Sequence, residues 1–155
     1  MTRVRFNHME LTLPKGVLTR EMRDDLTSFY GGVLGWETSD VEIVGGLQFL
    51  MRPDDEQFIL VAESRRPSQV PGYDHLGLLC DTRDDVDEIL GQCERFQEKD
   101  DRLELKRYDD LHTGNVVVHA FYVRYLLPIW FDVQSIDHKP GTGPAKRWQY
   151  APAAS

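Results

Sequence analysis

The chain has 155 residues, a formal net charge of −8, 41% apolar residues and 28% charged residues. This length suits one domain with its own core, and the negative charge argues against nucleic acid as a partner because phosphate contacts need a basic face. No run of about 18 apolar residues occurs, so we expect no membrane-spanning helix. No apolar run follows residues 1–5, so we expect no signal peptide. Cys80 and Cys93 are interpreted as free buried thiols, so we expect a cytoplasmic protein.

The first half of the chain predicts a strand, a helix and three further strands. Residues 6–13 alternate between apolar and polar, as in a half-buried strand. From residue 18 to residue 34 the apolar residues recur at helical spacing, and Gly35 ends this pattern. Three short strands with glycine- or proline-containing turns between them are expected next, at 37–44, 47–52 and 57–62.

The second half repeats this order after a polar linker at 65–72. A strand is expected at 75–80, and the acidic residues 81–85 then begin a helix that reaches Phe96. Three further strands are expected at 103–107, 116–125 and 129–135. The sequence therefore predicts an α+β domain over 1–137 built from two repeats, about 4–66 and 72–137, and an irregular tail at 138–155.

A short phrase occurs once in each half and carries a histidine near its start. The copies are Asn7-His8-Met9-Glu10-Leu11 and Asp74-His75-Leu76-Gly77-Leu78, 67 residues apart. Self-similarity at a fixed offset is typical of one structural unit used twice. Two such units related by a pseudo-twofold axis would bring both histidines to one shared site.

Alternation along the strands assigns the polar residues to faces. It sets His8, His75 and Asp132 on the face away from the helices, and we expect Ile59, Val61 and Trp130 to line the same face as a substrate-binding surface. Two imidazoles and a carboxylate can hold a divalent metal and leave positions open for substrate. The alternative is that each histidine only forms hydrogen bonds.

The chain resembles the vicinal oxygen chelate superfamily, which contains glyoxalase I, bleomycin-resistance proteins and extradiol dioxygenases. The resemblance rests on the two histidine phrases, on Phe29-Tyr30-Gly31-Gly32-Val33-Leu34-Gly35-Trp36 and on Phe121-Tyr122-Val123-Arg124. It implies two βαβββ modules forming a curved open sheet around a central cavity. It also implies that His8, His75 and Asp132 are metal ligands, with Fe(II) or Mn(II) favoured, and that Tyr122 lies near the substrate.

Three histidine and arginine positions keep open alternatives. His112 lies where extradiol enzymes place an acid–base histidine, although an exposed loop residue is the competing interpretation. Arg124 shares the face of Tyr122 and could bind an anionic substrate group or form a surface salt bridge. His119 is interpreted as packed between sheet and helix. The superfamily acid is usually a glutamate, whereas this chain has Asp132.

Three functions compete at this level. The first is a metal-dependent enzyme, dioxygenase- or lyase-like, that chelates a catecholic or other oxygen-rich substrate. The second is a metal-free protein of the bleomycin-resistance type that sequesters an aromatic small molecule. The third is a chain that acts only in protein assembly. A homodimer is expected in each case, with residues 148–150 as a possible contact.

Overall fold

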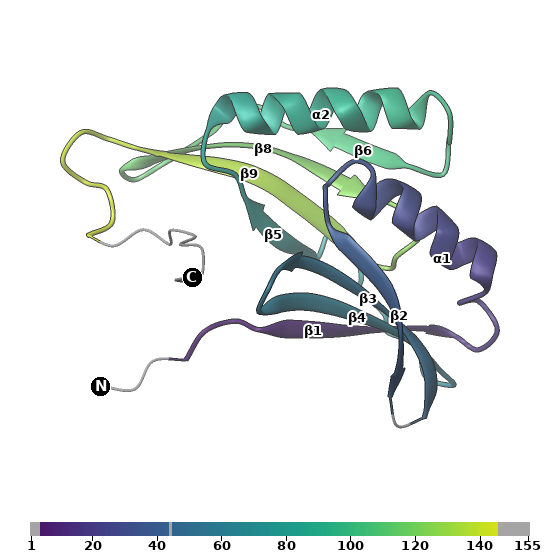
Figure 1. The fold of residues 1–155 in the computed structure, drawn as a ribbon. Coiled ribbons are helices and arrows are strands. Elements are labelled where there is room, and N and C mark those ends of the chain that lie inside the picture. Colours follow the sequence, from purple (N-terminus) through teal and green to yellow (C-terminus); the bar gives the residue numbers. More distant parts are fainter. Residues whose placement is uncertain (1–3, 44, 146–155) are drawn as a thin grey trace, which may run out of the picture.

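The computed structural model describes residues 4–43 and 45–145, which fold as two modules (Figure 1). The elements of the first module are β1 (His8–Pro14), α1 (Arg20–Leu26), the π-helix η1 (Thr27–Gly31), β2 (Glu37–Ile43), β3 (Gly46–Asp54) and β4 (Gln57–Ser64). The elements of the second are β5 (His75–Leu79), α2 (Arg83–Gln97), β6 (Glu104–Arg107), β7 (Leu111–Thr113), β8 (Val116–Arg124) and β9 (Trp130–His138).

Each module forms its own sheet, and the two sheets share one topology. The strand order is β1-β4-β3-β2 in the first sheet and β5-β9-β8-β6 in the second, where β7 also pairs with β8. The opening strand of each module runs parallel to the last one, and the other pairs are antiparallel. The predicted α+β architecture of repeated strand–helix–strand modules is confirmed.

The structure differs from the sequence-based expectation in the first helix. The α-helix ends at Leu26, and a π-helical turn follows over residues 27–31. This wider turn leaves the adjacent residues Phe29 and Tyr30 both fully buried. The short strand β7 also lies where a loop was expected, and the predicted contact at 148–150 falls outside the described residues.

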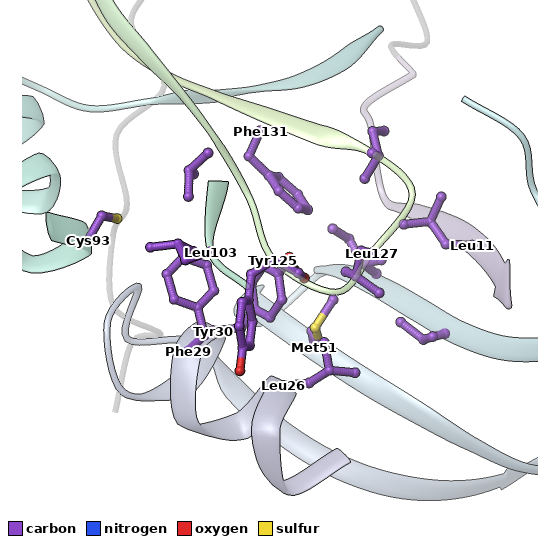
Figure 2. Close-up of a cluster of buried hydrophobic side chains, with 14 of the residues drawn as sticks. Leu11, Leu26, Phe29, Tyr30, Met51, Cys93, Leu103, Tyr125, Leu127 and Phe131 are labelled. Carbon is purple, nitrogen blue, oxygen red and sulfur yellow. Dashed lines mark hydrogen bonds between the residues drawn. The ribbon is translucent and has the colours of Figure 1, made fainter. Parts of the chain in front are cut away.

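Aromatic side chains of η1 join the modules in one core (Figure 2). The ring centroid of Phe29 lies 5.1 Å from that of Tyr125, which follows β8, and 5.2 Å from that of Phe96 on α2. The Tyr30 hydroxyl donates a hydrogen bond of 3.0 Å to the Tyr125 carbonyl. This hydrogen bond spans 95 residues of sequence and connects the first module to the second.

Helix α2 lies along one face of the second sheet, and among residues 4–43 and 45–145 no helix covers the opposite face (Figure 1). It begins with a capping box in which Thr82 and Asp85 exchange hydrogen bonds. We call the face turned away from α2 the open face. Within the described part of the chain, no helix has the length and apolarity that crossing a membrane requires.

Candidate functional site on the open face

The open face presents its side chains in rows that run across the strands. Lys106 of β6 pairs with Tyr122 of β8, and Tyr122 pairs with Asp132 of β9. Gly77 of β5 pairs with Asp132 from the other side. Directly paired residues point to the same face of a sheet. Asp132 therefore has an aromatic neighbour on one side and a position without a side chain on the other.

The adjacent row places an ion pair on an indole ring. The Arg124 guanidinium donates two hydrogen bonds of 2.8 Å to the Glu104 carboxylate. Its central carbon lies 4.5 Å from the ring centroid of Trp130. Of the two roles left open for Arg124, the structure contains the salt bridge, and this pairing largely neutralises the guanidinium charge.

His75 and Asp132 meet at the centre of these rows. His75 Nε2 lies 3.7 Å from Asp132 Oδ2, and the ring donates from Nδ1 to the Tyr73 carbonyl over 2.9 Å. That hydrogen bond fixes the tautomer of the neutral ring. Nε2 then carries a free lone pair beside the carboxylate, which is the arrangement that metal-binding histidines use.

The Asp132 carboxylate is buried without full hydrogen bonding. The residue is 8% exposed, and its Oδ1 has no hydrogen-bond partner in the described part of the structure. Burial raises the pKa of Asp132, and His75 offsets part of this rise. A side chain at Gly77 would crowd the Gln134 amide, 3.1 Å from an ideal Cβ. An anionic oxygen in this setting suits a bound cation.

His8 lies on the other sheet. Its ring stacks on Phe58, with centroids 4.8 Å apart, and its Nδ1 donates to Asn7 Oδ1 over 2.6 Å. Across residues 4–43 and 45–145, no three histidine, cysteine or acidic side chains converge where they could hold a metal ion. One chain therefore brings together two of the three predicted ligands, His75 and Asp132, and leaves His8 exposed elsewhere.

The Tyr122 ring contacts His75 and lies among three further aromatic rings, and we call Tyr73, Tyr108, Tyr122 and Trp130 the aromatic patch. The Tyr122 ring centroid lies 4.8 Å from that of His75 and 4.9 Å from that of Tyr108. The Tyr73 and Trp130 centroids are 5.5 Å apart. Burial is the main cause of a raised pKa at Tyr122, so the hydroxyl keeps its proton at neutral pH. Tyr73 is 50% exposed and Tyr108 is 42% exposed.

Sequence reasoning missed Lys106 and two of these tyrosines. The Lys106 ammonium lies 3.6 Å from the ring centroid of Tyr73 and 5.1 Å from that of Tyr108. A signal for Lys106 was present in the sequence, because Leu103 and Leu105 belong to the core side. Alternation from these leucines sets Lys106 on the open face. Tyr73 and Tyr108 lie in loops, where alternation gives no information.

The assignment of Ile59 and Val61 to a substrate-binding surface is wrong. They are 2% and 0% exposed and belong to the hydrophobic core. Val61 pairs with Leu11 and Ile59 pairs with Met51, whose side chains point to the helix side. Strand β4 is an inner strand with apolar residues on both faces, so alternation could not decide which set faces the core.

His112 is also placed away from the predicted site. It lies exposed on β7 and pairs with Val117, which by alternation along β8 shares a face with His119 rather than with Tyr122. The acid–base role that His112 was given requires the open face, where Asp132 lies. The structure therefore contradicts an acid–base role for His112 at the site formed by His75 and Asp132 of its own chain.

His119 packs between β8 and α2, as the sequence indicated, and forms part of an ionic network. Its Nε2 lies 2.8 Å from Asp87 Oδ1, and its Nδ1 lies 2.8 Å from Asp110 Oδ1. Arg83 also contacts Nδ1 and forms an ion pair with Asp110. Burial lowers the pKa of His119. The hydrogen bonds to the two aspartates together raise the pKa by more than burial lowers it, so the pKa is raised overall.

Comparison with known proteins gives structural neighbours. No protein-family model matches the chain, and no curated protein matches its sequence. TnmS3, an antibiotic binding protein from Streptomyces sp. CB03234, is 14% identical with a TM-score of 0.55, covering 88% of this chain and 99% of that one. Lactoylglutathione lyase from Agrobacterium tumefaciens is 16% identical with a TM-score of 0.56, covering 86% and 95%.

A third neighbour was solved with a metal. A point mutant of the fosfomycin resistance protein FosX from Listeria monocytogenes, in complex with Mn(II) and 1S,2S-dihydroxypropylphosphonic acid, is 12% identical. Its TM-score is 0.57, and the match covers 85% of this chain and 92% of that one. At such identities the likeness is one of fold. The chain shares the glyoxalase-like fold of these neighbours.

Proposed function

We propose that this chain is a divalent-metal-dependent enzyme, lyase- or dioxygenase-like, in which His75 and Asp132 hold the ion together with His8 of a second copy. The observation that carries the proposal is the buried Asp132 Oδ1 without a hydrogen-bond partner among the described residues, on a carboxylate 3.7 Å from His75 Nε2. Fe(II) or Mn(II) suits two imidazoles and one carboxylate. Such an ion would act as a Lewis acid toward two neighbouring substrate oxygens.

A second copy is invoked because both histidines lie on terminal strands, which among the described residues have no further strand beside them. β1 carries His8 at the edge of the first sheet, and β5 carries His75 at the edge of the second. Apolar side chains near both edges are exposed, with Phe6 at 56% and Leu79 at 70%. Exposed edges and apolar residues favour association. A homodimer that sets one chain's first sheet against its partner's second sheet would supply the third ligand.

The chain's own residues would position the substrate. Tyr122 keeps its phenol proton, so it can donate a hydrogen bond to a substrate oxygen held beside His75. Tyr73 provides exposed ring surface beside the same point, whereas Trp130 is 6% exposed and has the Arg124 guanidinium over its ring. Two neighbours support the proposal: FosX was solved with Mn(II) and a vicinal diol, and the other is a lyase.

The first test is the metal content of protein purified without chelators. We expect near-stoichiometric iron or manganese by elemental analysis, and loss of that metal in His75→Ala with an unchanged circular dichroism spectrum. His112→Ala is the matched control, because this histidine lies on the opposite face and should leave the metal in place. Protein that is metal-free and rebinds neither ion would refute the enzyme proposal.

The second test asks whether the site is shared between copies. His8→Ala and Asp132→Asn chains are unfolded together, refolded as a mixture and assayed for manganese. A shared site gives mixed dimers with one intact site each, so about one quarter of the wild-type binding returns. If binding stays absent in the mixture while wild-type protein recovers its own after the same treatment, the shared site is wrong.

A second candidate function is a metal-free binder of an aromatic small molecule. The aromatic patch favours it, because exposed rings such as Tyr73 offer stacking surface without any need for a metal. TnmS3, one of the structural neighbours, is an antibiotic binding protein. Tight binding of an aromatic compound by protein that neither carries nor rebinds metal would select this function over the enzyme.

A further inference from the structure

Lys106 is a cation on the open face whose charge is not neutralised by a carboxylate. Within residues 4–43 and 45–145, no acidic oxygen lies within 4.0 Å of its ammonium. Its neighbours are the rings of Tyr73 and Tyr108. Rings attract a cation through their quadrupole but carry no formal negative charge. The ammonium is therefore held in a defined place and keeps its charge for an incoming anion.

The other cation of this face differs in that respect. Arg124 forms two hydrogen bonds with Glu104, which satisfies its charge inside the protein. Lys106 and Arg124 lie in neighbouring rows of the same face, one paired with Tyr122 and the other with Glu104. An anion on this face would therefore gain more from Lys106 than from Arg124.

The Tyr122 ring lies between Lys106 and the His75–Asp132 pair. Lys106 pairs with Tyr122 and Tyr122 pairs with Asp132, so two strand spacings, about 10 Å in all, separate the first backbone from the last. A planar ring resting on Tyr122 could therefore direct one substituent toward Lys106 and the opposite one toward His75. An aliphatic ligand would use the charge but not the ring surface.

We infer that the open face binds an aromatic ring bearing one anionic group, with the anion on the Lys106 ammonium and the ring over Tyr122. This rests on the proposed function only in using the same face, since neither contact requires a metal ion. Lys106 is a specificity residue in this scheme. The tyrosines on either side hold its ammonium in place before the ligand arrives, which lowers the entropy lost on binding.

Three probes of similar size separate charge from ring surface. 4-Hydroxybenzoate has both features, 4-hydroxybenzamide lacks the charge, and cyclohexanecarboxylate lacks the aromatic ring. Each is titrated by isothermal calorimetry into the full-length protein in EDTA. We expect 4-hydroxybenzoate to bind at least about tenfold more tightly than either comparison compound. Equal binding of the three, or no binding of 4-hydroxybenzoate, would overturn the inference.

Variants then assign the charge to Lys106. Lys106→Gln should weaken 4-hydroxybenzoate about tenfold and leave 4-hydroxybenzamide unchanged, and Lys106→Arg should restore most of the loss. Lys99→Gln removes the same charge from an exposed site after α2 and serves as the control. Thermal unfolding verifies that each variant is folded. If Lys99→Gln weakens binding as much as Lys106→Gln, only net charge matters and the inference fails.

The outcome is independent of the metal proposal. Manganese binding is measured on the same preparations without EDTA, where Lys106→Gln should match wild type and His75→Ala should not bind. Charge- and ring-dependent binding in EDTA supports the inference even if manganese never binds. Manganese binding without any preference for 4-hydroxybenzoate would instead support the proposed function and refute the aromatic anion.

Discussion

The substitution Asp132→Asn should make the metal-free protein more stable. The wild-type carboxylate is buried, and its Oδ1 lacks a hydrogen-bond partner in the described part of the structure. An unsatisfied buried polar group costs about 1–3 kcal/mol, more when charged. The new amide needs partners of its own, so we expect a net gain of about 1 kcal/mol. For a domain of this size that raises Tm by about 2–4 °C.

Manganese should reverse this order of stability. A ligand at a hundredfold excess over its Kd stabilises the folded state by about 2.7 kcal/mol, and Asp132→Asn forgoes most of that. Thermal unfolding of both proteins in EDTA and in manganese measures the two differences. Asp101→Asn makes the same chemical change at an exposed position and should alter neither. A lower Tm for Asp132→Asn in EDTA would show that the carboxylate is already well paired and would refute the reasoning.

Three other predictions concern the scaffold. Phe29→Ala removes a fully buried ring from the core that joins the modules, so urea unfolding should show a loss of about 3–5 kcal/mol; a loss below about 1 kcal/mol would contradict that role. Gly32→Ala sets a Cβ against the carbonyl four residues earlier and should cost about 1–3 kcal/mol of stability. Gly91→Ala lies inside α2, where the new Cβ meets no atom closer than 3.5 Å, and should stabilise the fold by up to about 1 kcal/mol. Equal effects of the two variants in thermal unfolding would contradict the geometry. The pKa of His119 is raised by its two aspartates. The stability that the protonated ring adds to the fold should therefore be complete below about pH 6.5 and should be lost as the pH rises through the folded-state pKa. Urea titrations at pH 6 and pH 9 should show a smaller loss of unfolding free energy in His119→Asn than in wild type, and an equal loss would assign it to another group.

Alternation along single strands predicted much of the open face. His75 and Asp132 were assigned to one face from the apolar residues beside them, and the structure places them 3.7 Å apart. The reason is that β5 has one covered side, and that on β9 the polar Asp132 and Gln134 alternate with the apolar Phe131 and Val133. Leu76 and Leu78 pack against the core while His75 and Leu79 are exposed. In a strand with one buried face, the alternation of apolar and polar residues shows which face is buried.

The same method failed where burial is two-sided or where pairing decides the outcome. On β4 the residues of both faces are buried, Leu60 at 8% exposed and Val61 at 0%. Because apolar residues occupy both faces, the sequence pattern does not indicate which face lies toward the core. The three-residue strand β7 has no pattern of its own, so the face of His112 followed only from its register against β8. Lys106 could be assigned to a face but not to its tyrosine partners, because loops bring Tyr73 and Tyr108 to it.

The two copies of the histidine phrase share one hydrogen-bonding arrangement of the ring, but the residues around each ring differ. In both, Nδ1 donates to a nearby oxygen, from Asn7 in the first copy and from Tyr73 in the second, and Nε2 is left with its lone pair. The surroundings differ, because His8 stacks on a phenylalanine ring whereas His75 has Asp132 beside it. A duplicated strand supplies a pair of imidazoles but no carboxylate and no anion anchor. Asp132 of β9 and Lys106 of β6 supply those groups, so the ligand preference of this protein should follow changes on the open face of the second sheet.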